Sequence, residues 1–341
     1  MDLKSNKYII IGGAALLLLG IFLGGEVEQY YAKIKTAKIA KATHPLRASS
    51  VDYKYINPLL GYDTANATEF GEYEELESSL EHEVNKELDS KDLEKFSIYF
   101  RDLSRGRWLG INENDEYTPA SLLKVPVMMV YYKLSESQPD VLNQKITFNS
   151  SSSDIKNIET IVPSQKLVAG QSYSIDDLIN RMIVYSDNDA LELLYSHIDQ
   201  NLLVKFFSDF GILLPEGTGQ PQDFISPKTY ALFFRVLYGS TYLNRFDSEK
   251  ALEILNKVEY KNALVAGVPS DIDVGHKFGE YGTLIGDQVQ SREFHDCGVI
   301  YYPNHPYLLC VMTKGKDINH LQSVIKQTSE IVYKEIKNLY H

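Results

Sequence analysis

The chain has 341 residues, with 46 acidic against 34 basic side chains and a formal net charge of −12. This acidic balance argues against a nucleic-acid-binding protein, and the sequence contains neither a basic stripe nor a Gly-rich phosphate loop. The eight histidines are scattered without the spacing typical of metal ligands, so we expect neither a metal nor a cofactor.

The amino terminus predicts a membrane anchor. Lys4 and Lys7 precede residues 8–25, which are eighteen consecutive residues without a charge. That length is at the lower end of what spans a bilayer, exceeds the apolar part of most cleavable signals, and precedes no clear small-x-small cleavage site. We therefore expect a short cytoplasmic tail over residues 1–7 and an uncleaved transmembrane helix over 8–25. A buried helix of a soluble domain is the alternative.

A linker is expected next, over residues 26–72. After an initial helical piece it shows no sustained periodicity, and prolines and glycines interrupt it, as in a stalk that holds a domain off the membrane. Its apolar residues between 53 and 62, Tyr55 and Ile56 among them, leave open a second possibility. Part of the linker then packs against the domain that follows.

Residues 73–341 are long enough for one large domain with two lobes. Leucine and valine recur every four residues from Leu76 to Leu88, which predicts an opening helix. Alternating apolar residues predict a strand hairpin over 96–111, a second strand pair over 293–313 precedes a closing helix, and helical patterns fill the middle. We therefore expect an α+β fold. We expect an antiparallel sheet built from both ends of the domain and flanked by the terminal helices. An all-helical lobe should be inserted, with the active site between the two lobes.

The two cysteines, Cys297 and Cys310, belong to the second strand pair. If its turn is centred on residues 303 and 304, the cysteines lie opposite one another and can form a disulfide. Two buried free thiols are the alternative, and the sequence favours it, because a change of one residue in turn length would separate the pair.

A candidate nucleophile lies at the start of an apolar helix. Ser121 and Lys124 are three residues apart, which places them on one helical face, and residues 127–132 continue as an apolar run expected to be buried all round. A serine hydroxyl needs a base to take its proton, and a lysine whose pKa is lowered by burial can be that base. Taken alone, a Ser-x-x-Lys spacing is common by chance.

Two further motifs follow in the chain. Residues 186–188 read Ser-Asp-Asn and connect two helical patterns, and residues 277–279 read Lys-Phe-Gly where a strand is expected. In this order, Ser-x-x-Lys, Ser-Asp-Asn and Lys-x-Gly resemble the signature motifs of the penicillin-recognising serine enzymes, the class A β-lactamases and penicillin-binding proteins. The resemblance runs from about residue 73 to the end of the chain. It implies a β-lactamase/transpeptidase-like fold.

The resemblance also implies roles for individual residues. Ser121 would attack a carbonyl and form an acyl-enzyme, with Lys124 helping to remove the proton. The oxyanion would bind the backbone N–H groups of Ser121 and of Glu280, the residue after Gly279. The remaining roles fall on polar side chains: Ser186 as proton relay, Asn188 as the group that holds the substrate amide and orients Lys124, and Lys277 as the partner of a substrate carboxylate. Helix capping is the alternative role for Asp187 and Asn188.

The sequence departs from the family pattern at two places. Phe278 stands where the family usually has Thr or Ser, so it cannot donate a hydroxyl to a substrate carboxylate. Residues 213–223 are short and lack the Glu-x-x-Leu-Asn pattern whose glutamate activates the deacylating water in class A β-lactamases. Glu216 is the one glutamate there, and a solvated turn residue is its expected role. We therefore expect slow deacylation.

Three functions agree with this sequence. The first is a membrane-anchored, extracytoplasmic serine hydrolase that forms an acyl-enzyme with a β-lactam or a peptidoglycan (D-Ala-D-Ala-type) peptide. The second is a true class A β-lactamase, and the third is a cell-envelope binding or scaffold protein with the same fold. The resemblance favours an extracytoplasmic domain, because the family's substrates are outside the cell. Charge counting opposes this orientation, since four lysines follow the predicted span and two precede it.

Overall fold

The computed structural model describes residues 46–47, 54–56, 59–60, 73–90, 92–150, 160–215, 222–285 and 288–340. The predicted anchor at residues 8–25, most of the linker, and Glu216 lie outside these residues. The chain divides into two compact units, one of residues 1–48 and 59–62 and one of residues 49–58 and 63–341. In the first unit, β1 (Leu46–Arg47) pairs with β2 (Leu59–Leu60). Among the described residues, no helix is long and apolar enough to cross a membrane.

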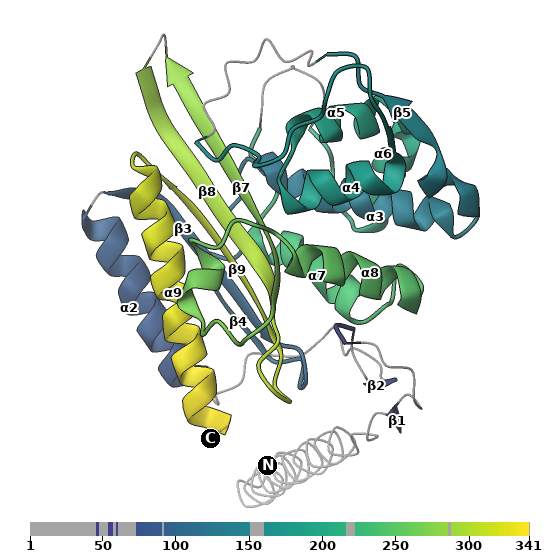
Figure 1. Ribbon diagram of the computed structural model, residues 1–341. Helices are drawn as coiled ribbons and strands as arrows, with labels where there is room; N and C mark the ends of the chain where they lie inside the picture. The colour runs from purple at the N-terminus through teal and green to yellow at the C-terminus, as the bar shows by residue number, and fades with distance from the viewer. Residues whose placement is uncertain are drawn as a thin grey trace, which may run out of the picture. The chain divides into compact units, whose positions relative to one another are not determined.

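A five-stranded antiparallel sheet forms the centre of the second unit, in the order β4-β3-β9-β8-β7 (Figure 1). The bounds of its strands in chain order are β3 (Leu93–Asp102), β4 (Trp108–Ile111), β7 (Val274–Ile285), β8 (Gln288–Ile300) and β9 (Tyr307–Gly315). The first two strands come from the start of the domain and the other three from its end. The predicted α+β fold, with a sheet built from both ends of the domain, is therefore confirmed.

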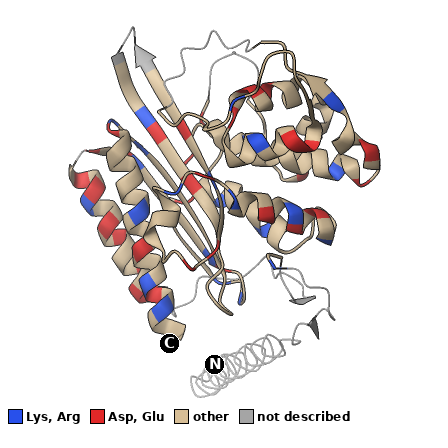
Figure 2. Ribbon diagram, in the orientation of Figure 1, with Lys and Arg blue, Asp and Glu red and all other residues tan. Residues whose placement is uncertain are grey.

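Helices cover both faces of this sheet. The helices α2 (Glu74–Ser90) and α9 (Ile318–Tyr340) contact each other and cover one face together, with the short helix η4 (Leu264–Gly267) packed on α9 (Figure 1). Charged residues are distributed along both long helices (Figure 2). On α2, Leu76, Leu80 and Val84 are fully buried, as the four-residue periodicity predicts.

A helical lobe is inserted between β4 and β7, as expected. It begins with η2 (Ala120–Leu123) and α3 (Lys124–Ser135) and contains η3 (Pro139–Asn143) and the short strand pair of β5 (Lys145–Thr147) and β6 (Ser172–Ser174). The five helices that follow are α4 (Ile175–Val184), α5 (Asn188–His197), α6 (Gln200–Asp209), α7 (Pro227–Tyr238) and α8 (Arg245–Asn256). Each begins directly after a side chain that accepts a backbone N–H bond, namely Ser174, Asp187, Asp199, Ser226 or Asn244.

Part of the segment predicted as a linker packs on the domain. The carboxylate of Glu249 on α8 accepts hydrogen bonds from the backbone N–H groups of Lys54, Tyr55 and Ile56, at 2.6 to 2.9 Å. Ile56 is buried, and the ring of Tyr55 lies 5.2 Å from that of Tyr301. Residues 54–56 are therefore held as a short strap against α8, and the apolar residues of this segment have a packing role.

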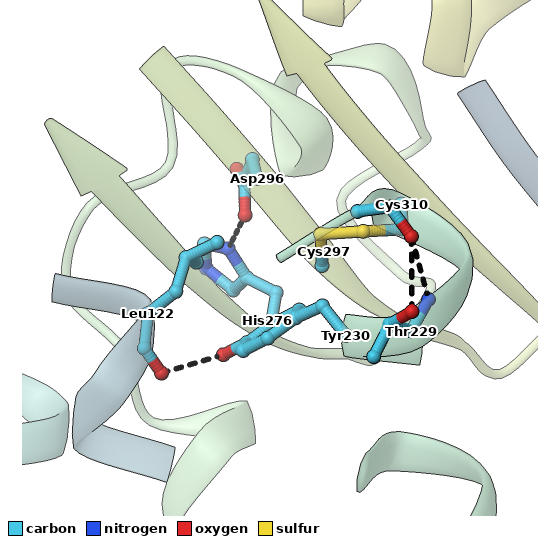
Figure 3. The surroundings of a disulfide bond; sticks show 8 residues. Leu122, Thr229, Tyr230, His276, Asp296, Cys297 and Cys310 are labelled. Carbon is cyan, nitrogen blue, oxygen red and sulfur yellow. Dashed lines mark hydrogen bonds and ion pairs between the residues drawn. A yellow bond between two sulfur atoms is a disulfide. The ribbon is translucent and has the colours of Figure 1, made fainter. Parts of the chain in front are cut away.

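Cys297 and Cys310 form a disulfide between β8 and β9 (Figure 3). They are direct partners in the strand register, with the turn between Ile300 and Tyr307 as predicted. The favoured expectation of two free thiols is therefore wrong. The reason is that the turn has the one length that aligns the pair, which local sequence does not specify.

Replacing both cysteines, as Cys297→Ala with Cys310→Ala, should lower the free energy of unfolding by about 2–4 kcal/mol, because the cross-link restricts the unfolded chain. Denaturant unfolding measures this loss, and reduction of the wild-type protein is the matched control, since it should produce a similar decrease. Thiol labelling of unfolded, unreduced protein should find no free thiol; two labelled cysteines would show that the bridge does not form.

Candidate active site

The predicted nucleophile lies in a tight turn at the start of α3. Ser121 belongs to η2 and is buried, and Lys124 is the first residue of α3. Ala120 has a left-handed backbone, with φ of 48°. A residue other than glycine adopts this conformation only where the surrounding structure imposes it, and such residues are concentrated at functional sites. Residues 124–132 are all buried, as the apolar run predicts.

Lys124 has no exposed surface and lies among four oxygen atoms. Its Nζ is 2.9 Å from Ser121 Oγ, 3.0 Å from Ser186 Oγ, 2.7 Å from the Ser186 carbonyl oxygen and 2.6 Å from Asn188 Oδ1. The three-residue spacing therefore does bring the amine to the hydroxyl. The amine also joins α3 to the connection between α4 and α5, across 62 residues of sequence.

Lys277 extends this group of polar side chains from the side of the sheet. Its Nζ donates to Ser186 Oγ at 3.0 Å and to the Phe278 carbonyl oxygen at 2.9 Å, and Ser186 Oγ lies 3.4 Å from Ser121 Oγ. Ser186, like Ala120, has a left-handed backbone, with φ of 56°. We call Ser121, Lys124, Ser186, Asn188 and Lys277 the Lys124 cluster. The structure brings together all five residues predicted from the three motifs.

The sequence left open whether Asp187 and Asn188 cap a helix or serve the site, and the structure gives each residue one of these roles. Asp187 caps α5, because its Oδ1 accepts from the N–H groups of Asp189 and Ala190. Burial raises the pKa of the Asp187 carboxyl above its ordinary value. Asn188 does not cap this helix; its side-chain oxygen accepts from Lys124.

The Lys-Phe-Gly segment runs along β7 and contacts the turn at Pro119 and Leu122, which carries Ser121. A Cβ atom added at Gly279 would meet the carbonyl oxygen of Pro119 at 2.9 Å and the backbone nitrogen of Leu122 at 3.2 Å, so a side chain would force the strand away from η2. This close approach places the backbone of β7 beside the turn that carries Ser121. It is the arrangement that two converging oxyanion donors would need.

The side chain of Glu280 makes contacts that the sequence did not predict. It is buried, and its carboxylate accepts from Thr160 N and Oγ1 at 2.8 to 3.1 Å, from Ile161 N at 3.3 Å and from Arg292 Nη1 at 3.1 Å. The motif resemblance predicts a role only for the backbone N–H of Glu280, as an oxyanion donor. Its partner Thr160 is 120 residues away, so no local pattern could have indicated the contact.

Phe278 takes a place beside the ammonium group of Lys277. Its ring centroid is 3.8 Å from Lys277 Nζ and 4.5 Å from the ring of Tyr260, and the side chain is 4% exposed. The position therefore offers Lys277 an aromatic face instead of a hydroxyl.

Two buried side chains on β8 hold the turn that precedes Ser121. Glu293 accepts from Thr118 N–H at 2.9 Å, and His295 Nε2 lies 3.1 Å from the Thr118 carbonyl oxygen. The Thr118 hydroxyl donates to Asp223 at 2.8 Å, and Asp223 also pairs with Lys95. Sequence reasoning missed these residues. The available signal was two ionisable residues, spaced by two, on one face of a predicted strand.

Glu293 is ionised in this arrangement. Burial opposes its charge, but hydrogen bonds and attraction from His295 and Lys314 outweigh burial and hold the pKa of Glu293 below its ordinary value of 4.5. Among the residues that the structure describes, there is no group of three or more His, Cys, Asp or Glu arranged to hold a metal ion.

Glu293→Gln should lower the free energy of unfolding at pH 7 by about 1–3 kcal/mol, because charge-assisted hydrogen bonds to the Thr118 N–H and Lys314 are lost. A carboxylate whose folded pKa is lowered stabilises the protein above its unfolded pKa, and this stabilisation is lost as the pH falls through the folded pKa. The difference from wild type should therefore shrink below about pH 4.5.

Denaturant unfolding over a series of pH values measures this difference. Glu253→Gln is the matched control, because Glu253 is half exposed in a surface ion pair with Lys257 and its loss should change stability little at any pH. A difference between Glu293→Gln and wild type that stays constant from pH 7 to pH 3 would contradict the prediction.

Comparisons with known proteins agree with this fold. Three solved structures each match 76–78% of this chain over 97–99% of their own length. They are a PBP-A point mutant as an acyl-enzyme complex with penicillin G, with 20% sequence identity and a TM-score of 0.63, and a β-lactamase from Xanthomonas campestris pv. campestris, with 21% identity and a TM-score of 0.65. The third is an ancestral class A β-lactamase, with 19% identity and a TM-score of 0.61. At these identities the likeness establishes the fold. A family model described as the β-lactamase enzyme family matches residues 79–336, which is most of the chain. The chain belongs to the β-lactamase enzyme family.

Proposed function

We propose that this protein is a serine hydrolase that acts on amide bonds through an acyl-enzyme on Ser121. The observation that carries the proposal is the contact of 2.9 Å between Ser121 Oγ and the fully buried amine of Lys124, continued by Ser186 and Lys277. An amine held against a hydroxyl, with a second hydroxyl and a second lysine behind it, is suited to move protons during acyl transfer.

In the proposed reaction, Ser121 Oγ attacks the substrate carbonyl carbon while the neutral amine of Lys124 takes the hydroxyl proton. The oxyanion that forms accepts hydrogen bonds from the N–H groups of Ser121 and Glu280, each worth about 3 kcal/mol in the transition state. The bond from carbon to nitrogen then breaks. Ser186 gives its proton to the departing nitrogen, and Lys124 passes the proton it took from Ser121 to Ser186. In net, Ser121 has lost one proton, the leaving group has gained one, and Lys124 and Ser186 are restored.

The proposed substrates are β-lactams or peptidoglycan peptides of the D-Ala-D-Ala type, with slow deacylation. The acyl-enzyme complex of the PBP-A mutant with penicillin G supports this class of substrate. The short segment around Glu216, which lacks the Glu-x-x-Leu-Asn pattern, supports slow hydrolysis of the acyl-enzyme. We further propose that residues 8–25 anchor the protein in the cell membrane with the domain outside. The Cys297–Cys310 disulfide supports that location, because disulfides persist in oxidising compartments.

Intact mass of the full chain, followed over time with penicillin G, tests this proposal. The wild-type protein should gain the mass of one penicillin and keep it for many minutes. Ser121→Ala should gain none, and Lys124→Ala should acylate about 10²–10⁴-fold more slowly, because the base is absent. Ser137→Ala is the matched control, since Ser137 is exposed just after the end of α3 and its substitution should leave the adduct unchanged.

The other outcomes separate the alternatives. Hydrolysed drug without a lasting adduct would reject slow deacylation and identify a true class A β-lactamase. An adduct that persists in Ser121→Ala would reject Ser121 as the nucleophile. The absence of both adduct and hydrolysis, with penicillin G and with an uncharged activated ester, would reject the enzyme and leave a protein of this fold that only binds a ligand.

A further inference from the structure

A pocket of about 280 Å³ lies beside Lys277 of the Lys124 cluster. Two of its walls are Tyr185 and Phe278, which are the chain neighbours of Ser186 and Lys277. The Phe278 ring contacts the Lys277 amine, which contacts Ser186, which in turn reaches Ser121. The pocket therefore adjoins the proposed reaction centre, and Phe278 is a wall of the pocket that also contacts Lys277.

The walls of this pocket are mainly apolar where they are buried. Val184 and Phe278 are 7% and 4% exposed, and Tyr260 packs on the Phe278 ring. Its two charged residues, Glu259 and Lys261, are exposed. The remaining lining residues are Ile161, Val162, Ser164 and Asn262. An occupant that reaches the buried end thus meets aromatic and aliphatic surface, and charged groups lie at the solvent side.

Residues 160–164 form one side of the pocket, and hydrogen bonds hold both ends of this segment in place. Thr160 and Ile161 donate to the Glu280 carboxylate, and Ser164 Oγ donates to Glu259 at 2.6 Å. The backbone N–H of Glu259 donates to the Val184 carbonyl oxygen at 3.0 Å, which fixes the opposite wall to α4. The pocket is therefore already formed before any ligand binds.

The surroundings of Lys277 favour an uncharged group over an anion. Its ammonium group already contacts Ser186 Oγ, the Phe278 carbonyl oxygen and the face of the Phe278 ring. Phe278 offers no hydroxyl, and the side chains that tie residues 160–164 are two carboxylates, Glu259 and Glu280. A substrate carboxylate placed here would lose water without gaining a full set of donors.

We infer that this pocket is a substrate subsite for an uncharged apolar group next to the scissile bond, and that Phe278 determines this specificity. The inference narrows the proposed substrates to β-lactams and peptides in which this group is not a free carboxylate, and it rests on the proposed function for the reacting end of the substrate. Complete small-molecule sites usually measure about 300–1,000 Å³, so this volume suits one aromatic ring or a branched aliphatic chain.

Penicillin G and its benzyl ester test the subsite, because they share the reactive ring and differ in the charge and size of one group. The second-order rate of Ser121 acylation is measured by intact mass for the full chain. Wild type should prefer the ester, and Phe278→Thr should lower the ester-to-acid rate ratio by about tenfold or more, since the apolar wall is replaced by a hydroxyl that can bind the carboxylate. Phe246→Thr is the matched control, because Phe246 is 68% exposed on α8 and lies outside the pocket.

A second variant avoids the buried wall in case Phe278→Thr does not fold. Val162→Lys changes a side chain that is 64% exposed at the pocket, and the added ammonium should raise acylation by the acid several-fold while leaving the ester unaffected. A rate ratio that neither variant changes would overturn the inference, even if Ser121 is acylated by both compounds.

Equilibrium binding to Ser121→Ala separates this inference from the proposed function. The benzyl ester should bind this protein more tightly than the acid, and adding Phe278→Thr should remove that preference. If the ester binds in this way but Ser121 of the wild type is never acylated, the proposed function is wrong and the subsite stands. If Ser121 is acylated but Ser121→Ala shows no preference for the ester, the subsite is wrong and the proposed function stands.

Discussion

The buried amine of Lys124 is the interaction on which the rest of the site depends. It has no exposed surface, and it lies within hydrogen-bond distance of oxygen atoms of Ser121, Ser186 and Asn188. Burying a polar group such as an amine costs free energy unless hydrogen-bond partners of this kind surround it. The α4–α5 connection must therefore approach the start of α3 closely, and the left-handed backbones of Ala120 and Ser186 are the local strain that this approach imposes.

The turn that carries Ser121 is also held in place by contacts with strands of the sheet. Glu293 and His295 on β8 bind the two backbone polar groups of Thr118, and Gly279 on β7 allows the strand to approach the turn closely. Ser121 thus lies between a rigid strand pair and the first buried turn of α3. This arrangement fixes the position of Ser121 more accurately than a mobile loop would, because the supporting side chains are themselves buried and hydrogen-bonded.

The fold persists in proteins whose sequences differ from this chain at most positions. The solved relatives share 19–21% of their residues with this chain, and the antiparallel sheet and helical lobe persist at that distance. Phe278, which replaces the Thr or Ser expected in the Lys-x-Gly motif, presents a ring to Lys277. The contacts between Ser121, Lys124 and Ser186 are present beside it.

The sequence by itself determined the elements and the members of the cluster. Four-residue and two-residue periodicities are local, so they identified α2, the β3–β4 hairpin and the apolar run of α3, and the three motifs supplied all five residues that meet at Lys124. Only the tertiary structure decided the contacts between distant segments. The Cys297–Cys310 bridge depended on a register that one residue would change, and the contacts of Glu280 with Thr160 and of Glu249 with residues 54–56 join side chains to backbone N–H groups more than a hundred residues away. A backbone N–H group has no sequence signature, and this is the physical reason why these contacts could not be read from the chain.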